Sequence, residues 1–189
     1  MAATTTDETT RRDFLYIATG DVAAIGAAAA AWPIIDQMNP STAVLALSSI
    51  EVDLTPIPLG QQVVYKYRGR PLFVRRRTPK EIATANAVPV ASLIDPIARN
   101  ANLPDSAPAT DADRATKPEW LVVIGVCTHL GCTPTVSTPT APQGEYGGWL
   151  CHCHGSQYDV AGRVRKGPAP QNLAIPPYAF LSDTRIKVG

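Results

Sequence analysis

The residues with metal-binding side chains are gathered in two short segments of this chain. The sequence contains four cysteines and three histidines, and all of them fall within residues 127–132 (CTHLGC) and 151–159 (CHCHGSQYD). Each segment offers a cysteine followed closely by a histidine, Cys-x-His in the first and Cys-x-x-His in the second, and each adds a further cysteine. Thiolates and imidazoles bind zinc and iron–sulfur clusters, and this spacing differs from that of zinc fingers. The two segments predict a mixed cysteine–histidine metal centre, with structural zinc as an alternative.

The two segments resemble those of the Rieske iron–sulfur proteins, in which two cysteines bind one iron and two histidines bind the other. The resemblance implies one [2Fe–2S] cluster. It assigns Cys127 and Cys151 to the inner iron, and His129 and His154 to the outer iron. Position 152 is a histidine where relatives usually carry proline, so His152 is a rival ligand. We interpret His152 as an exposed loop residue, because His154 is the histidine that a Gly-Ser pair follows.

The same resemblance implies roles for the residues around the cluster. It pairs Cys132 with Cys153 in a disulfide that joins the two loops. It places four residues next to the cluster as a cap or as hydrogen-bond donors that tune it: Leu130, Gly131, Ser156 and Tyr158. It assigns a third loop as a cover over the cluster: Gly167, Pro168, Ala169 and Pro170. The prolines stiffen such a cover, because their rings fix the backbone.

The N-terminal part is predicted to be an export signal and a membrane anchor. Arg11-Arg12 followed by Phe14-Leu15 and an apolar stretch is typical of a twin-arginine signal, so residues 1–13 are expected to be cytoplasmic. Residues 14–36 are long enough to cross a bilayer as one helix. The alternative is a cleaved signal peptide. The two arginines place the N-terminus in the cytoplasm, and the rest of the chain in the bacterial periplasm.

Residues 37–48 read as a linker of small, uncharged residues, and the resemblance implies a flexible hinge there. Residues 49–189 are expected to form the periplasmic Rieske domain, with cluster-binding loops at about 127–170. Alternating runs and Pro/Gly turns predict a mainly β fold, an antiparallel sandwich with an inserted cluster-binding subdomain. The expected strands are residues 50–54, 63–67, 72–76, 119–127, 149–150, 175–181 and 185–188.

Two stretches give weaker signals. Residues 78–118 are interpreted as an insertion, partly helical from Pro79 and partly loop. The run Arg75–Arg77 is interpreted as a solvated strand end. With a net charge of +1 and no basic patch interleaved with aromatics, the sequence argues against nucleic-acid binding.

The resemblance extends to the Rieske subunits of the ubiquinol–cytochrome c oxidoreductases, the cytochrome bc complexes. It implies that the chain is an enzyme subunit, inactive alone, in a dimeric membrane complex with a cytochrome b subunit and a c-type haem subunit. His154 would bind ubiquinol and accept its proton, and a domain swing would deliver the electron to the haem. Three alternatives stay open: a Rieske ferredoxin or oxygenase domain, against which Cys132 and Cys153 argue; the small subunit of a periplasmic arsenite oxidase; and a zinc-binding interaction module.

Overall fold

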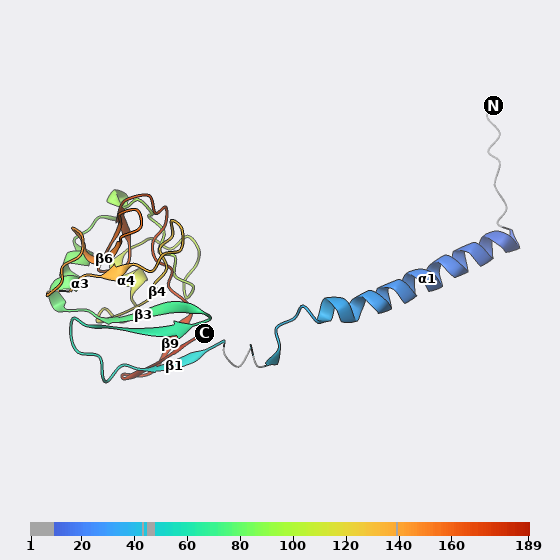
Figure 1. Cartoon of the computed structure of the whole chain (residues 1–189), viewed down its shortest axis with the longest axis horizontal. Helices are drawn as coiled ribbons and strands as arrows, with labels where there is room; N and C mark the ends of the chain where they lie inside the picture. Colours follow the sequence, from blue (N-terminus) through green and yellow to red (C-terminus); the bar gives the residue numbers. More distant parts are fainter. Residues whose placement is uncertain (1–9, 43, 45–47, 139) are drawn as a thin grey trace, which may run out of the picture. The chain divides into compact units, whose positions relative to one another are not determined.

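The computed structural model describes residues 10–42, 44, 48–138 and 140–189 (Figure 1). The chain divides into two compact units, residues 1–45 and 46–189. Of the predicted segments, most of the N-terminal stretch 1–13 and residues 43 and 45–47 of the expected hinge lie outside the described residues.

The first unit is built on one long helix, α1 (Arg11–Asp36). It begins three residues before the predicted start because Thr10 and Asp13 form a capping box. The Thr10 side chain accepts from the Asp13 N–H, and the Asp13 carboxylate accepts from the Thr10 N–H at 2.8 Å, which satisfies two free backbone donors. With 26 residues, the helix is about 39 Å long. By length and composition it could span a membrane, in agreement with the predicted apolar helix.

The second unit contains three antiparallel sheets, which confirm the mainly β prediction (Figure 1). The first sheet has the order β1 (Ile50–Asp53), β10 (Arg185–Val188), β9 (Tyr178–Ser182). The second has the order β2 (Gln62–Tyr67), β3 (Arg70–Arg76), β4 (Trp120–Ile124). The third has the order β5 (Thr135–Val136), β6 (Gly147–Cys151), β7 (Ser156–Asp159), β8 (Val164–Lys166). The third sheet, which carries the second metal-binding segment, is thus inserted between β4 and β9.

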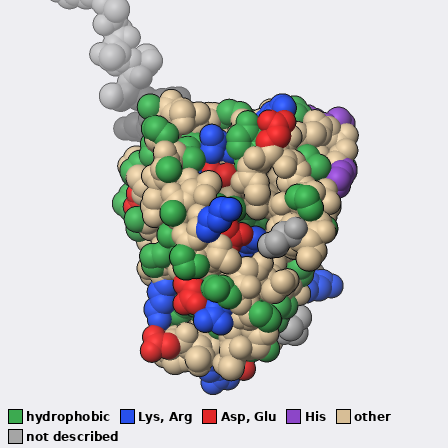
Figure 2. All heavy atoms as spheres, turned by 90° about the vertical axis from the view of Figure 1, so that its left-hand side faces the viewer, with side chains coloured by type: hydrophobic (Ala, Val, Ile, Leu, Met, Phe, Trp, Pro, Cys, Tyr) green, Lys and Arg blue, Asp and Glu red, His purple; other side chains and the backbone are tan. Residues whose placement is uncertain are grey.

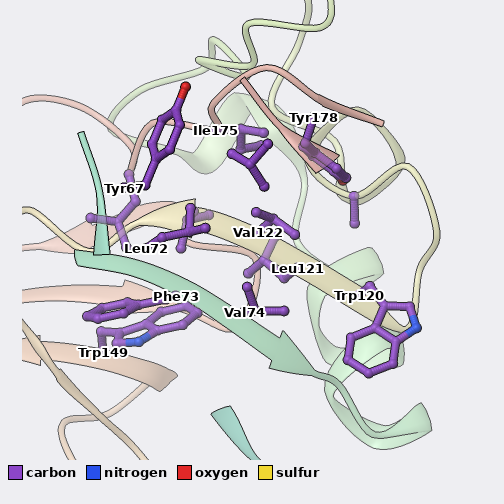
Figure 3. Packing of buried hydrophobic residues seen from close by; sticks show 14 of the residues in the cluster. Tyr67, Leu72, Phe73, Val74, Trp120, Leu121, Val122, Trp149, Ile175 and Tyr178 are labelled. Atoms are coloured by element: carbon purple, nitrogen blue, oxygen red, sulfur yellow. The ribbon is translucent and has the colours of Figure 1, made fainter. Parts of the chain in front are cut away.

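The central strand of the second sheet, β3, is buried on both faces. Leu72 and Val74 point to one face and Phe73 to the other, and none of the three is more than 2% exposed. The Phe73 ring stacks on Trp149 of β6 with ring centroids 6.1 Å apart (Figure 3). This contact joins the second sheet to the sheet that carries Cys151, so one hydrophobic core supports both cluster-binding loops.

The insertion between β3 and β4 carries α3 (Pro79–Asn86), the 3₁₀ helix η1 (Val90–Ser92) and α4 (Asp111–Arg114). The helix predicted to begin at Pro79 is confirmed, and its N-terminus is capped by Thr78. Loops join these short elements, and they are fixed by buried polar contacts rather than by a regular apolar face.

The interpretation of Arg75–Arg77 as a solvated strand end was wrong. Arg75 and Arg77 are 2% and 0% exposed, and only Arg76 is partly exposed. Arg77 forms a two-pronged ion pair with Asp111 and donates to the Pro118 carbonyl, whereas Arg75 pairs with Glu81. Carboxylates from the insertion neutralise both guanidinium groups, and burial of a charge without such partners is costly.

Candidate metal centre

The two cysteine–histidine loops have the same backbone closure. The first loop follows β4, and its Gly131 N–H donates to the Cys127 carbonyl at 2.9 Å. The second loop joins β6 to β7, and its Gly155 N–H donates to the Cys151 carbonyl at 2.9 Å. Both glycines have positive φ angles, 84° and 77°, which favour glycine because a Cβ atom is disfavoured there. Each loop is therefore a tight turn that fixes a cysteine and the following histidine.

The loops place sulfur donors inside and nitrogen donors outside. Cys127 and Cys151 are each 2% exposed, whereas His129 is half-buried and His154 is exposed. The two imidazole rings meet edge to face with centroids 4.7 Å apart. In Figure 2 the histidines lie at one edge of the domain surface. The ring that contacts His129 is that of His154, whereas the neighbouring His152 is exposed.

One atom of this group shows that the residues fit a metal cluster. His129 Nδ1 is buried and has no hydrogen-bond partner among the described residues. A buried polar atom without a partner costs about 1–3 kcal/mol, and ligation of a metal ion would remove that cost. Two buried thiols beside two imidazoles are also the ligand set of a cluster with cysteine on one iron and histidine on the other.

The two buried thiols differ in acidity. Burial raises the pKa of Cys127, but hydrogen bonds from the Tyr158 hydroxyl, the His129 backbone N–H and the Cys151 and Ser156 side chains outweigh it, so the pKa lies below its usual value. Burial raises the pKa of Cys151, and the neighbouring Cys127 raises it further. The Tyr158 pKa is raised by its own burial and by its bond to Cys127, so Tyr158 remains a neutral donor.

Two of the four predicted tuning residues, Tyr158 and Ser156, lie next to the Cys127 thiol. Tyr158 and Ser156 are fully buried, and the Tyr158 hydroxyl donates to Cys127 Sγ at 3.3 Å. The same hydroxyl accepts the Thr128 N–H at 3.2 Å. Leu130 is 71% exposed at the tip of the first loop, and Gly131 closes that loop. The structure thus places two hydroxyl groups inside and one apolar side chain outside.

The third loop is held against the second. Gly167 lies so close to it that a Cβ atom there would be 2.6 Å from Ser156 Cα. Ala169 is buried, and its N–H donates to the Ser156 hydroxyl oxygen at 3.1 Å. Pro168 and Pro170 are exposed on either side of it. The segment 167–170, which we call the cover loop, therefore packs on Ser156.

A second contact near the cover loop, which the sequence does not predict, involves Thr128. Thr128 Oγ1 donates to the Gln171 carbonyl at 2.7 Å and lies 3.3 Å from the Gln171 nitrogen, which donates to it. A hydroxyl group can donate and accept at once, so one threonine joins the first loop to the residue directly after the cover loop. In the sequence, the only sign of this role is that Thr128 lies between the predicted ligands Cys127 and His129.

The predicted disulfide is not present in the structure. Cys132 and Cys153 are both free thiols, although the sulfur atoms of Cys132, Cys151 and Cys153 all lie within 4.8 Å of one another. The Cys132 thiol is the main cause of a raised pKa at Cys153. Disulfide sulfurs are about 2.05 Å apart, so this arrangement brings the two thiols near each other without the covalent bond.

Comparison with known proteins defines the class to which this fold and site belong. Residues 110–178 match the family described as the Rieske [2Fe-2S] domain. Residues 1–41 match the family described as "Ubiquitinol-cytochrome C reductase Fe-S subunit TAT signal". The chain is therefore a Rieske iron–sulfur protein, and the predicted twin-arginine signal is confirmed.

Whole-chain relatives narrow the class to one family. The chain is 54% identical over 182 residues to the ubiquinol-cytochrome c reductase iron-sulfur subunit of Rickettsia typhi, covering 96% of this chain and 94% of the relative. It is 52% identical over 190 residues to the subunit of the same description from Blastochloris viridis, covering 100% and 98%. The chain belongs to the family of ubiquinol–cytochrome c reductase iron–sulfur subunits.

A solved structure agrees at the level of the fold. A chain of "Hyperthermophilic respiratory Complex III" is 24% identical and superposes with a TM-score of 0.50, covering 90% of this chain and 98% of that chain. Family membership makes this chain an electron-transfer subunit with one Rieske [2Fe–2S] cluster. Neither the arsenite oxidase nor the zinc-module alternative is favoured.

Proposed function

We propose that this subunit takes one electron and one proton from ubiquinol at the outer quinol site of a cytochrome b subunit and passes the electron to a c-type haem. The observation that carries the proposal is the inside–outside arrangement of the four donors. Two buried thiols face the core, whereas the His154 ring is exposed beside His129. A partner can therefore reach the nitrogen side of the site without opening the domain.

Four side chains would hold the cluster: Cys127, Cys151, His129 and His154. When bound, the [2Fe–2S] cluster supplies a one-electron acceptor whose potential is higher than that of an all-cysteine cluster, because neutral histidines replace two thiolates. The buried, unpartnered Nδ1 atom of His129 supports its place in this set.

His154, the exposed histidine, would also accept the proton of the quinol hydroxyl. The ring nitrogen of His154 that does not bind iron can accept a hydrogen bond from a quinol hydroxyl and then hold its proton. Leu130, at the tip of the neighbouring loop, would contact the apolar ring of the quinol and exclude water from that hydrogen bond. Exclusion of water strengthens such a contact, because the local dielectric constant falls.

The buried hydroxyl groups would set the reduction potential. Tyr158 donates to Cys127 Sγ, and we assign Ser156 as a second donor to cluster sulfur, since it also helps to lower the Cys127 pKa. Hydrogen bonds to sulfur offset negative charge and favour the reduced state. The cover loop would shield these bonds from water.

We further propose that Cys132 and Cys153 become a disulfide in the oxidising periplasm, where the disulfide of a thiol oxidant takes up the two electrons and two protons that the thiols lose. Their sulfurs are already neighbours, and disulfides persist on that side of the membrane. The bond would fasten the first loop to the second loop, next to the ligands Cys151 and His154.

We also assign the remaining segments. Residues 1–13 would be a cytoplasmic signal segment, 14–36 the single transmembrane anchor, 37–48 a hinge, and 49–189 the periplasmic domain that swings between quinol and haem within a dimeric complex. The arginines at 11 and 12 support this orientation, and the separation of the chain into two units near residue 45 supports the hinge.

The test is a redox-poised electron paramagnetic resonance spectrum of membranes that contain the chain, recorded with and without an inhibitor of the outer quinol site. We expect the spectrum of the reduced cluster to change when the inhibitor displaces quinone, and His154→Ala to abolish the cluster signal. A wild-type cluster spectrum that does not respond to inhibitor or to removal of quinone would overturn the assignment of ubiquinol as the partner.

A further inference from the structure

Asn172, directly after the cover loop and Gln171, is bound from several directions by the insertion between β3 and β4. Its N–H donates to Asp95 Oδ2 at 3.0 Å, and its Nδ2 donates to the carbonyls of Asp95 at 3.0 Å and Ile97 at 2.8 Å. Its Oδ1 accepts the Val164 N–H at 2.9 Å. Asn172 and Asp95 are 1% and 3% exposed. Both amide donors of the side chain are thus satisfied, and the residue has one fixed position.

Asp95 is itself held in place. Its carboxylate accepts from Arg99 Nε at 2.9 Å and from the Ile97 N–H at 3.2 Å. Burial raises the pKa of Asp95, but the donors from Arg99, Asn172 and Ile97 outweigh it, so the pKa lies below its usual value. The group is therefore a carboxylate at neutral pH, and its hydrogen bonds to N–H donors are of the stronger, charge-assisted kind.

A buried arginine fastens the same two segments a second time. Arg114 has no exposed surface, and it donates to the carbonyls of Ala98 in the insertion and Leu173 next to Asn172. It also donates to the Ala161 and Gly162 carbonyls in the turn after β7. The segment that carries Asp95 is thus fixed to the sheet that carries Cys151. Because the Asp95 carboxylate cannot move freely, it can hold the loop that it binds in one position.

We propose that Asp95 is a positioning residue for the cover loop, and through it for the hydroxyl group of Ser156. The chain of contacts runs from the Asp95 carboxylate to the Asn172 N–H, back along the cover loop to Ala169, and from the Ala169 N–H to Ser156 Oγ. Pro170 fixes one of the backbone torsions between these two residues, which limits how far the loop can adapt to a shift at Asn172.

The consequence for Ser156 follows from hydrogen-bond chemistry. The Ala169 N–H occupies one acceptor site of the Ser156 oxygen, so the hydroxyl proton points elsewhere. Thr128 binds the neighbouring Gln171, so the two residues that directly follow the loop are both held. Loss of the Asp95 contact would let the loop lift and let the Ser156 hydroxyl turn toward the Ala169 position. This inference rests on the proposed role of Ser156 as a donor to cluster sulfur.

The test compares Asp95→Asn with Asp113→Asn in the full-length chain within its membrane complex. Asp113 is a matched control: it lies in the same insertion and its carboxylate accepts from Thr110, but it does not bind the cover loop among the contacts described. Two quantities are measured: hydrogen exchange of the Ala169, Gln171 and Asn172 amides by mass spectrometry, and the midpoint potential of the cluster.

We expect Asp95→Asn to speed exchange of these amides by about tenfold, the effect of losing one hydrogen bond of about 1.4 kcal/mol, and to shift the reduction equilibrium several-fold toward the oxidised state. Asp113→Asn should change neither. A lower melting temperature with wild-type exchange rates and potential would overturn the proposal, because Asp95 would then only stabilise the fold.

Two further variants distinguish a failure of this proposal from a failure of Asp95→Asn to fold and from a failure of the proposed role of Ser156. If Asp95→Asn does not accumulate, Asn172→Ala removes the side-chain hydrogen bonds to the Asp95 and Ile97 carbonyls, which hold residue 172 against the same segment. It should give the same two effects, and normal exchange in Asn172→Ala overturns the proposal. If Ser156→Ala leaves the potential unchanged, the proposed role of Ser156 has failed, and the exchange data alone decide whether Asp95 positions the loop.

Discussion

Replacement of Tyr158 by phenylalanine should lower the midpoint potential of the cluster without removing the cluster. The Tyr158 hydroxyl is fully buried and donates to Cys127 Sγ at 3.3 Å. Phenylalanine keeps the ring and its packing but removes this donor. The negative charge on sulfur grows on reduction, so loss of the donor costs the reduced state more than the oxidised state.

The size of the shift can be worked from that one contact. A hydrogen bond within a protein contributes about 0.5–1.5 kcal/mol net, and more when one partner is charged. If about 1.4 kcal/mol is specific to the reduced state, the equilibrium moves tenfold, which is roughly 59 mV for one electron. The variant should also lose about 1–2 kcal/mol of folding free energy, because the Thr128 N–H loses its acceptor.

The assay is a potentiometric titration followed by electron paramagnetic resonance, with Tyr178→Phe as the control. The Tyr178 hydroxyl also accepts a backbone N–H, that of Thr116 at 3.4 Å, but it has no contact with a predicted ligand among the described residues. Tyr178→Phe should therefore keep the wild-type potential. An unchanged potential in Tyr158→Phe, or equal shifts in both variants, would refute the reasoning.

Four further predictions follow from the packing around the site. Gly167→Ala should lower the iron content per chain, because the new Cβ would lie 2.6 Å from Ser156 Cα; Gly69→Ala, with a similar φ and nothing within 4 Å, is the control, and equal iron contents would contradict the prediction. Cys132→Ser should speed loss of iron to a chelator if the proposed disulfide forms, whereas an unchanged rate would argue against that bond. Asp111→Asn should cost about 3–5 kcal/mol of unfolding free energy in urea titrations, because Arg77 would be left buried without its partner; a loss below about 1 kcal/mol would show that Arg77 finds another partner. Burial raises the pKa of Asp95, but hydrogen bonds from Arg99, Asn172 and Ile97 lower it further than burial raises it. Its contribution to stability is therefore complete above its ordinary pKa of about 3.9 and is lost as the pH falls through the lower folded value. The stability difference between wild type and Asp95→Asn should stay constant above about pH 4 and shrink below it.

The strands were predictable where local pattern decides them. The strands at 63–67, 72–76 and 185–188 were expected from alternating residues and turn signals, and the structure has β2, β3 and β10 at those places. Strands β5, β7 and β8 were not predicted, because they are short and their pairing partners in the sheet, rather than their own sequence, define them. The ligand segments stood out because cysteine and histidine occur nowhere else in the chain.

The insertion and the buried arginines were not predictable from local pattern. Arg77 and Asp111 are 34 residues apart, and a run of three arginines at a strand end gives no sign that two of them turn inward. The same holds for Asn172, whose partner Asp95 is 77 residues away. Polar contacts over such distances depend on the completed fold. The pattern of cysteines and histidines therefore predicted a ligand set, whereas the buried polar residues around it gave no local signal.

The identical closure of the two ligand loops has a consequence for protein engineering. Each loop contains a backbone hydrogen bond from a glycine four residues after the cysteine to the carbonyl of that cysteine, and β5 pairs with β6 between the two loops. Within this connection, Thr140, Ala141 and Pro142 are exposed, and the hydrogen bonds described for them are local. We expect a reporter peptide inserted among these three residues to leave both turns in place, so this position suits a label in a working subunit.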